Sequence, residues 1–113
     1  MGRVNQELDE TKVQVSAVPC KVRGFYFQNP NTYPVFVKFF NALSANVTMG
    51  TTAPTWERQI PAGDGTTQGW ICENNFNHVQ FDATTGLTIA ATKLTGIDNT
   101  ALASNIKAEV FYE

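Results

Sequence analysis

The chain has 113 residues and a formal net charge of −2, and charged residues make up 16% of it, against about 25% in an average soluble domain. This length fits one domain that buries its own core, and the scattering of the eight basic residues excludes a stripe that would bind a nucleic-acid backbone. A surface with so few charges is cheap to remove from water, so we expect the chain to pack against other protein subunits.

The polar N-terminal segment, residues 1–11, shows neither helical nor strand periodicity. It predicts an arm that is disordered or docked on a neighbouring molecule, ahead of a β-domain over residues 12–113. The segment contains no apolar run that would make it a signal peptide, and no stretch of the chain approaches the ~20 apolar residues of a membrane span. Synthesis and residence in a cytoplasm are therefore expected.

The first part of the domain predicts three strands. Residues 12–18 alternate between apolar and polar, which indicates a strand with one face in water. Two aromatic-rich segments, about residues 21–28 and 33–41, flank the turn sequence Asn-Pro-Asn-Thr. Helix is the competing prediction for the second of these segments, but its density of β-branched and aromatic residues favours a strand.

Five further strands are expected in the rest of the chain. They are residues 55–60, 66–72, 76–82, 87–93 and 106–112. The tight-turn sequences PAGDG and ATTG separate some of them, whereas long loops are expected at residues 43–54 and 94–105.

Eight strands in a chain of this length predict a sandwich, a jelly roll or a small barrel. The tight links would all lie at one end and the two long loops at the other, which favours an all-β, eight-stranded, jelly-roll-like antiparallel sandwich. In that topology the strands at residues 33–41 and 106–112 are neighbours in one sheet.

That pairing predicts an oligomer interface, because both strands carry phenylalanines on the face opposite the core. Phe36, Phe40 and Phe111 would lie together on one outer sheet surface, with Tyr26 as a weaker candidate. Burying such rings stabilises an interface by roughly 1.5–3 kcal/mol per side chain. The alternative is that the N-terminal arm or a long loop of the same chain covers one or more of them.

No residue cluster indicates catalysis, a cofactor or a metal. His78 is the only histidine, and a lone histidine in a strand is expected to be structural. Asp64 lies between two glycines and is expected to form a turn rather than to bind calcium. Cys20 and Cys72 lack metal-ligand spacing, so two reduced, buried thiols are expected; a disulfide would need an oxidising compartment. The sequence thus predicts a protein that is not an enzyme.

The two tryptophans are candidates for sugar stacking, since an exposed tryptophan on a β-sandwich can serve that purpose. Trp70 shares a strand face with Cys72 and is expected to pack inward. Trp56 begins a strand beside a long loop and is the candidate sugar contact. Packing in the core or at an edge is nevertheless favoured for both.

Four stretches carry a resemblance through their order and spacing over residues 13–113: VSAVPCKVRGFYFQNPNTYPVFVKFFNA, QIPAGDGTTQGW, TGLTIAATK and EVFYE. Together they resemble small virion proteins of tailed phages, of the capsid decoration or cement type. The resemblance implies a non-enzymatic protein on the outer capsid surface that forms homotrimers, or dimers, and clamps the major capsid protein. A carbohydrate- or receptor-binding tip module of a tail or fibre is the alternative. Neither implies a nucleic-acid or membrane partner.

Overall fold

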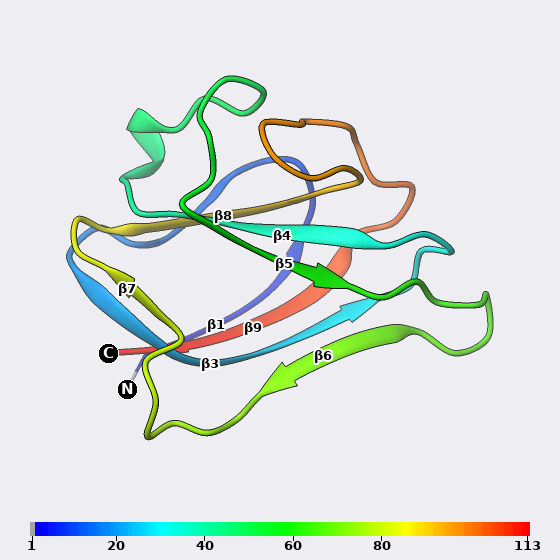
Figure 1. Ribbon diagram of the computed structural model, residues 1–113, viewed down its shortest axis with the longest axis horizontal. Helices are drawn as coiled ribbons and strands as arrows, with labels where there is room; N and C mark the ends of the chain where they lie inside the picture. The colour runs from blue at the N-terminus through cyan, green and yellow to red at the C-terminus, as the bar shows by residue number, and fades with distance from the viewer. Residues whose placement is uncertain (1) are drawn as a thin grey trace.

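Nine strands lie in two antiparallel sheets that pack face to face (Figure 1) in the computed structural model, which describes residues 2–113. The strands are β1 (Gly2–Leu8), β2 (Val13–Ser16), β3 (Cys20–Asn29), β4 (Val35–Phe40), β5 (Trp56–Ile60), β6 (Gly69–Glu73), β7 (Phe81–Ala83), β8 (Leu87–Thr92) and β9 (Ile106–Tyr112). One short 3₁₀ turn, η1 (Ser44–Asn46), accompanies them.

The first sheet, called sheet A, has the strand order β1-β9-β3-β6, and sheet B has the order β2-β8-β4-β5. Strand β3 is ten residues long and organises sheet A. It pairs with β9 along one side, while its other side pairs with β7 near its start and with β6 near its end.

The core between the sheets is built from alternate residues of these strands and is rich in aromatic rings. Phe25 and Phe27 of β3 stack at 4.9 Å between ring centroids, and both contact Phe39 of β4 across the sandwich. Trp56 and Phe81 extend this cluster, with ring centroids 5.7 Å apart. The period-two alternation of apolar residues that predicted strands is therefore the pattern that fills the core.

The all-β sandwich is confirmed. The predicted count of eight strands is not confirmed, because β1 precedes the eight predicted strands, which correspond to β2–β9. The jelly-roll order is not confirmed. The predicted neighbours, at residues 33–41 and 106–112, are β4 in sheet B and β9 in sheet A, so the prediction that they pair is wrong. The predicted strand at residues 76–82 is reduced to β7, because the residues before it form a loop.

The predicted N-terminal arm is also corrected. Gly2–Leu8 form β1, which pairs with β9 along its whole length and makes the edge of sheet A. Leu8 is fully buried and Val4 packs against the core from the same face. The polar Gln6 between them hides this alternation in the sequence, which explains the error.

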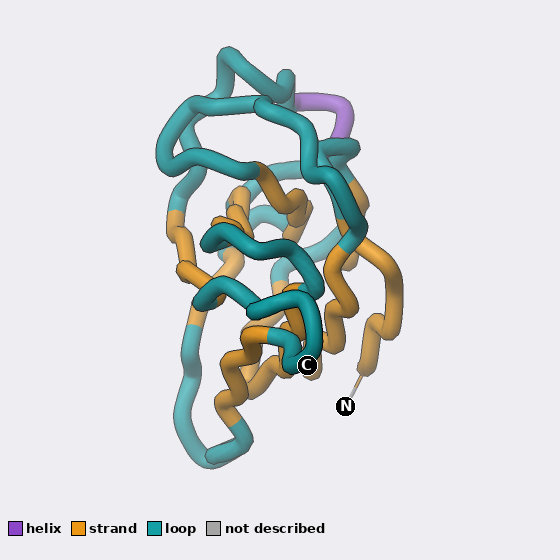
Figure 2. The backbone as a smooth tube through the Cα atoms, turned by 90° about the vertical axis from the view of Figure 1, so that its right-hand side faces the viewer, coloured by secondary structure: helices purple, strands orange, loops and turns teal. Residues whose placement is uncertain are grey.

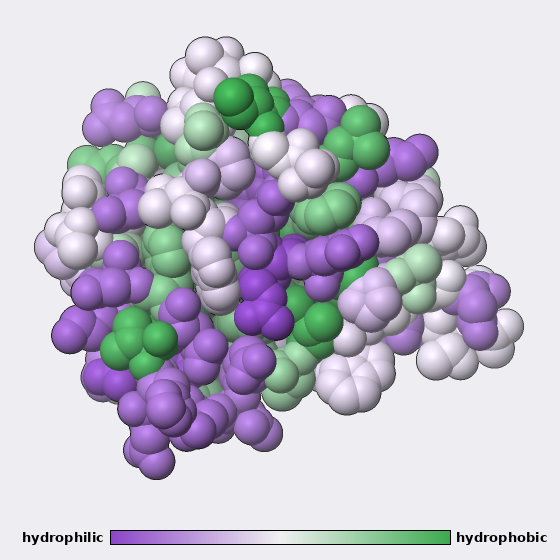
Figure 3. Space-filling model, viewed as in Figure 1, coloured by the Kyte–Doolittle hydropathy of each residue, from purple (hydrophilic) through white to green (hydrophobic). Residues whose placement is uncertain are grey.

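The two long loops lie together on the side of β8 and β4, at the top of Figures 1 and 2. The first packs on the outer face of sheet B, where Val47 joins Phe40 and Ala90 in a small second apolar cluster. Figure 3 shows hydrophobic residues on the viewer's side of the molecule as separate spots among polar ones.

We expect Phe39→Ala to lower the free energy of unfolding by about 3–5 kcal/mol, because Phe39 is fully buried between the sheets and its removal leaves a cavity. Urea unfolding followed by circular dichroism measures the loss. The matched control is Phe36→Ala on the same strand, where a half-buried ring faces outward and a clearly smaller loss is expected. Equal losses would contradict the assignment of inward and outward faces on β4.

Candidate binding surface

The outer face of sheet A is formed by alternate side chains of four neighbouring strands. The strand registers align them in two cross-strand rows. One row is Glu7, Lys107, Gln28 and Trp70, and the next is Asn5, Glu109, Tyr26 and Cys72. Side chains directly opposite each other on adjacent strands have Cβ atoms about 4.5–5.5 Å apart, so neighbours in a row can contact the same ligand.

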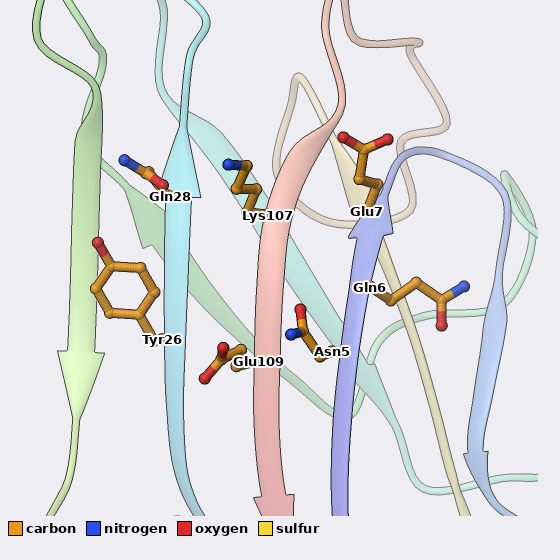
Figure 4. Close-up of a pocket in the computed structure, with 7 residues that line it drawn as sticks. All are labelled: Asn5, Gln6, Glu7, Tyr26, Gln28, Lys107 and Glu109. Carbon is orange, nitrogen blue, oxygen red and sulfur yellow. The ribbon is translucent and has the colours of Figure 1, made fainter.

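A polar groove of about 560 Å³ lies on this face (Figure 4). Its lining comes from β1, β3 and β9: Asn5, Gln6, Glu7, Tyr26, Gln28, Lys107 and Glu109. Lys107 has Glu7 directly across from it, but among residues 2–113 the only ion pair within 4.0 Å joins Arg23 to Glu113. The charged groups of the groove are therefore free to engage a partner.

Aromatic rings border the groove on the β6 side. The ring of Tyr26 stacks on Trp70, with centroids 6.4 Å apart and planes 19° apart, and Trp70 is 57% exposed. The prediction that Trp70 packs inward with Cys72 is wrong. Ile71 packs against the core instead, which turns its two neighbours outward.

A second aromatic pair lies near the other end of the same face. The ring of Phe76, from the loop after β6, contacts Phe111 of β9 with centroids 5.2 Å apart and is 41% exposed. Gly24 of β3 makes this approach possible, since a Cβ there would lie 2.3 Å from a ring carbon of Phe76. Two aromatic pairs thus flank the open face of sheet A.

The outer face of sheet B is covered by the chain itself. Lys38 is 1% exposed, and its Nζ donates a hydrogen bond of 2.7 Å to the backbone oxygen of Asp98 in the second long loop. Burial lowers the pKa of the Lys38 ammonium, and the nearby carboxylates of Glu57 and Asp98 oppose this shift. Glu57 also accepts a hydrogen bond from the backbone N–H of Gly96 in that loop. The loop is therefore held onto the sheet by polar contacts.

The four predicted interface residues do not form one patch, because β4 and β9 belong to different sheets. Phe36 and Phe40 lie on the outer face of sheet B, where Phe40 is only 2% exposed beneath Val47. The alternative that a long loop covers one of the rings is confirmed for Phe40. Tyr26 and Phe111 lie on the outer face of sheet A, half-buried.

Other sequence predictions have mixed outcomes. Trp56 packs against the core as favoured, with its ring stacked on Phe81, and is not an open sugar contact. Cys20 is buried as expected, but Cys72 is exposed, and both thiols are free. His78 lies in the exposed loop before β7 rather than in a strand.

Asp64 forms a turn, as expected. Its carboxylate accepts hydrogen bonds from the backbone N–H groups of Thr66 and Thr67, and these contacts lower its pKa. Within the part of the chain that the structure describes, no group of three His, Cys, Asp or Glu residues is placed to hold a metal ion. No helix among those residues is long and apolar enough to cross a membrane.

No protein-family model, no curated protein and no solved structure matches the chain.

We expect the stability of the wild type relative to Lys38→Met to rise with pH in the alkaline range. The pKa of Lys38 is lower in the folded state than its ordinary value of 10.5, so the unfolded state binds more protons between the two values. Raising the pH through that window removes the penalty for burying the charge. Urea unfolding of both proteins at several alkaline pH values measures the difference. A constant or falling difference would contradict the burial of a charged Lys38.

Proposed function

We propose that this chain is a non-enzymatic decoration (cement) protein of a tailed-phage virion, which binds the outer capsid surface as a homo-oligomer. The observation that carries the proposal is the asymmetry of the sandwich: loops of the chain cover sheet B, whereas the outer face of sheet A is open. The ordered motif series over residues 13–113 supports the virion as the setting.

The open face is the surface that we assign to the major capsid protein. Trp70 and Phe76 are large, exposed and held in place by their partners Tyr26 and Phe111. Burying such a ring contributes roughly 1.5–3 kcal/mol. Because the rings sit on a rigid sheet or stack on one, little conformational freedom is lost when they bind.

Decoration stabilises a capsid by mass action. A protein that binds the assembled lattice but not the dissociated subunits shifts the equilibrium away from disassembly. An oligomer with several attachment sites binds a lattice with a higher overall affinity than any one of its sites does alone. Synthesis in the host cytoplasm followed by binding to the outer capsid surface is the location that this function implies.

The test is co-sedimentation of the purified chain with capsids of the phage whose genome encodes it. We expect saturable binding and a higher temperature of capsid disassembly. Trp70→Ala and Phe76→Ala should each weaken binding about tenfold or more, since each removes a buried ring. The matched control is Leu94→Ala, which removes a side chain that is 54% exposed on the loop over sheet B. Absence of binding, or an equal effect of the control, would refute the proposal.

A second candidate is carbohydrate binding, and the polar groove beside the Tyr26–Trp70 stack favours it. Sugar rings stack on aromatic faces. Their hydroxyl groups can exchange hydrogen bonds with an amide such as Gln28 and accept them from an ammonium group such as Lys107. The tryptophan available for a sugar contact is Trp70, whose ring is exposed beside the groove, rather than Trp56.

A glycan array tests this candidate. Saturable binding by the isolated wild type, lost in Tyr26→Ala and in Gln28→Ala but kept in Phe36→Ala, is the expected result if the groove takes sugar. Absence of any glycan signal at high protein concentration would exclude this candidate and leave the capsid proposal standing.

A further inference from the structure

Strand β1 is a free sheet edge. It pairs with β9 on one side, and on its other side no residue of the described chain hydrogen-bonds to its backbone. Figure 2 shows the strand running up from the N-terminus along the periphery of the molecule. An open edge strand of seven residues offers a row of unpaired N–H and C=O groups to another strand.

We propose that β1 pairs antiparallel with β1 of a second copy of the chain, about a two-fold axis at Asn5. The inference deepens the proposed function, on which its biological role rests, by stating how the copies of the homo-oligomer join.

The charges of the strand favour one register. Centred on Asn5, the pairing sets Arg3 opposite Glu7 of the second copy, and symmetry repeats this contact on the other side. Directly opposite residues of an antiparallel pair project from the same face, so both charges lie on the outer face of sheet A. Pairing centred on Arg3 or on Glu7 would instead place like charges opposite each other.

Both charged groups are available for this contact. Arg3 and Glu7 are exposed, and neither takes part in an ion pair among residues 2–113. Opposite charges across an exposed strand pair add little affinity by themselves, but they discriminate between registers. Most of the binding free energy would come from the backbone hydrogen bonds and from further burial of Val4, which is now half-buried.

Three features that protect natural edge strands, namely proline, lysine and a β-bulge, are missing from β1. It contains no proline and no lysine, and its register with β9 is continuous over all seven residues. The corresponding edge of sheet B, β2, has only four residues and an irregular register between Gln14 and Ser16. Of these two edges β1 is the better template for a second copy.

The pairing would join the two copies of sheet A into one continuous sheet. Their open faces would then lie on the same side, so that Trp70 and Phe76 of both copies face one capsid surface. This geometry gives a two-fold dimer instead of the trimer that the sequence resemblance favoured.

Sedimentation equilibrium of five proteins tests the pairing in solution. We expect the wild type to dimerise, and Arg3→Glu and Glu7→Arg each to raise the dimer Kd by about tenfold, since each places like charges opposite each other. The double variant restores the opposite charges and should return to within about threefold of the wild type. Lys21→Glu, an equal charge change on an exposed site of β3, is the control and should have no effect. A monomeric or trimeric wild type, or a double variant weaker than both single variants, would overturn the pairing.

Cross-linking tests the register independently of these charges. In Asn5→Cys/Cys72→Ser, the two copies of residue 5 would have Cα atoms about 4.5–5.5 Å apart, within disulfide reach. In Arg3→Cys/Cys72→Ser, the two copies of residue 3 would be about 14 Å apart. Mild oxidation should therefore give a covalent dimer on a non-reducing gel for the first variant and none for the second. The opposite result would refute the register.

Capsid co-sedimentation separates this inference from the proposed function. A wild type that dimerises but binds no capsid would refute the capsid role and leave the pairing intact. Capsid binding by a wild type that is monomeric in sedimentation would refute the pairing and leave the capsid role intact.

Discussion

The packing of β3 against β4 is the contact on which the rest of the structure depends. Phe25 and Phe27 stack on each other from one face of β3 and contact Phe39 across the sandwich, and these three rings are fully buried. Because side chains alternate along a strand, this inward set turns Tyr26 and Gln28 outward. The same ten-residue strand therefore supplies the aromatic core and the middle of the open face, so a one-residue slip in its register would exchange the two.

The two sheets differ in how far loops of the same chain cover their outer faces. On sheet B the long loops bury Phe40 and Lys38, and the ammonium group of Lys38 is satisfied by a loop carbonyl. A buried amine costs free energy unless it is hydrogen-bonded, which makes the position of the loop part of the fold. On sheet A the loop after β6 places Phe76 against Phe111, but Trp70, the polar groove and the edge strand β1 remain accessible. Attachment to other molecules is the property that this asymmetry supports.

The two proposed contacts use different parts of sheet A. The face carries the paired rings and the groove, which suit a partner surface, while the edge strand β1 suits a second copy. Pairing through β1 engages Glu7 at the rim of the groove but leaves the Tyr26–Trp70 stack uncovered. A rigid antiparallel sheet holds the face and the edge in fixed relation, which is the condition for an oligomer to engage a regular lattice with several sites at once.

Period-two alternation and turn residues determined most of the strands and the all-β class from the sequence alone, and β9 begins and ends at the predicted residues 106 and 112. Local pattern also predicted the turn at Asp64 and the packing of Trp56.

Which strands pair was decided only by the tertiary structure, because alternation reports the two faces of a strand but not its neighbour. The placement of β4 and β9 in different sheets separated Phe36 and Phe40 from Phe111. Trp70 faces outward because Ile71 packs against the core. The polar N-terminal residues form β1 because the backbone of β9 offers them hydrogen bonds. Both causes lie in contacts between distant parts of the chain, which a local sequence pattern does not contain.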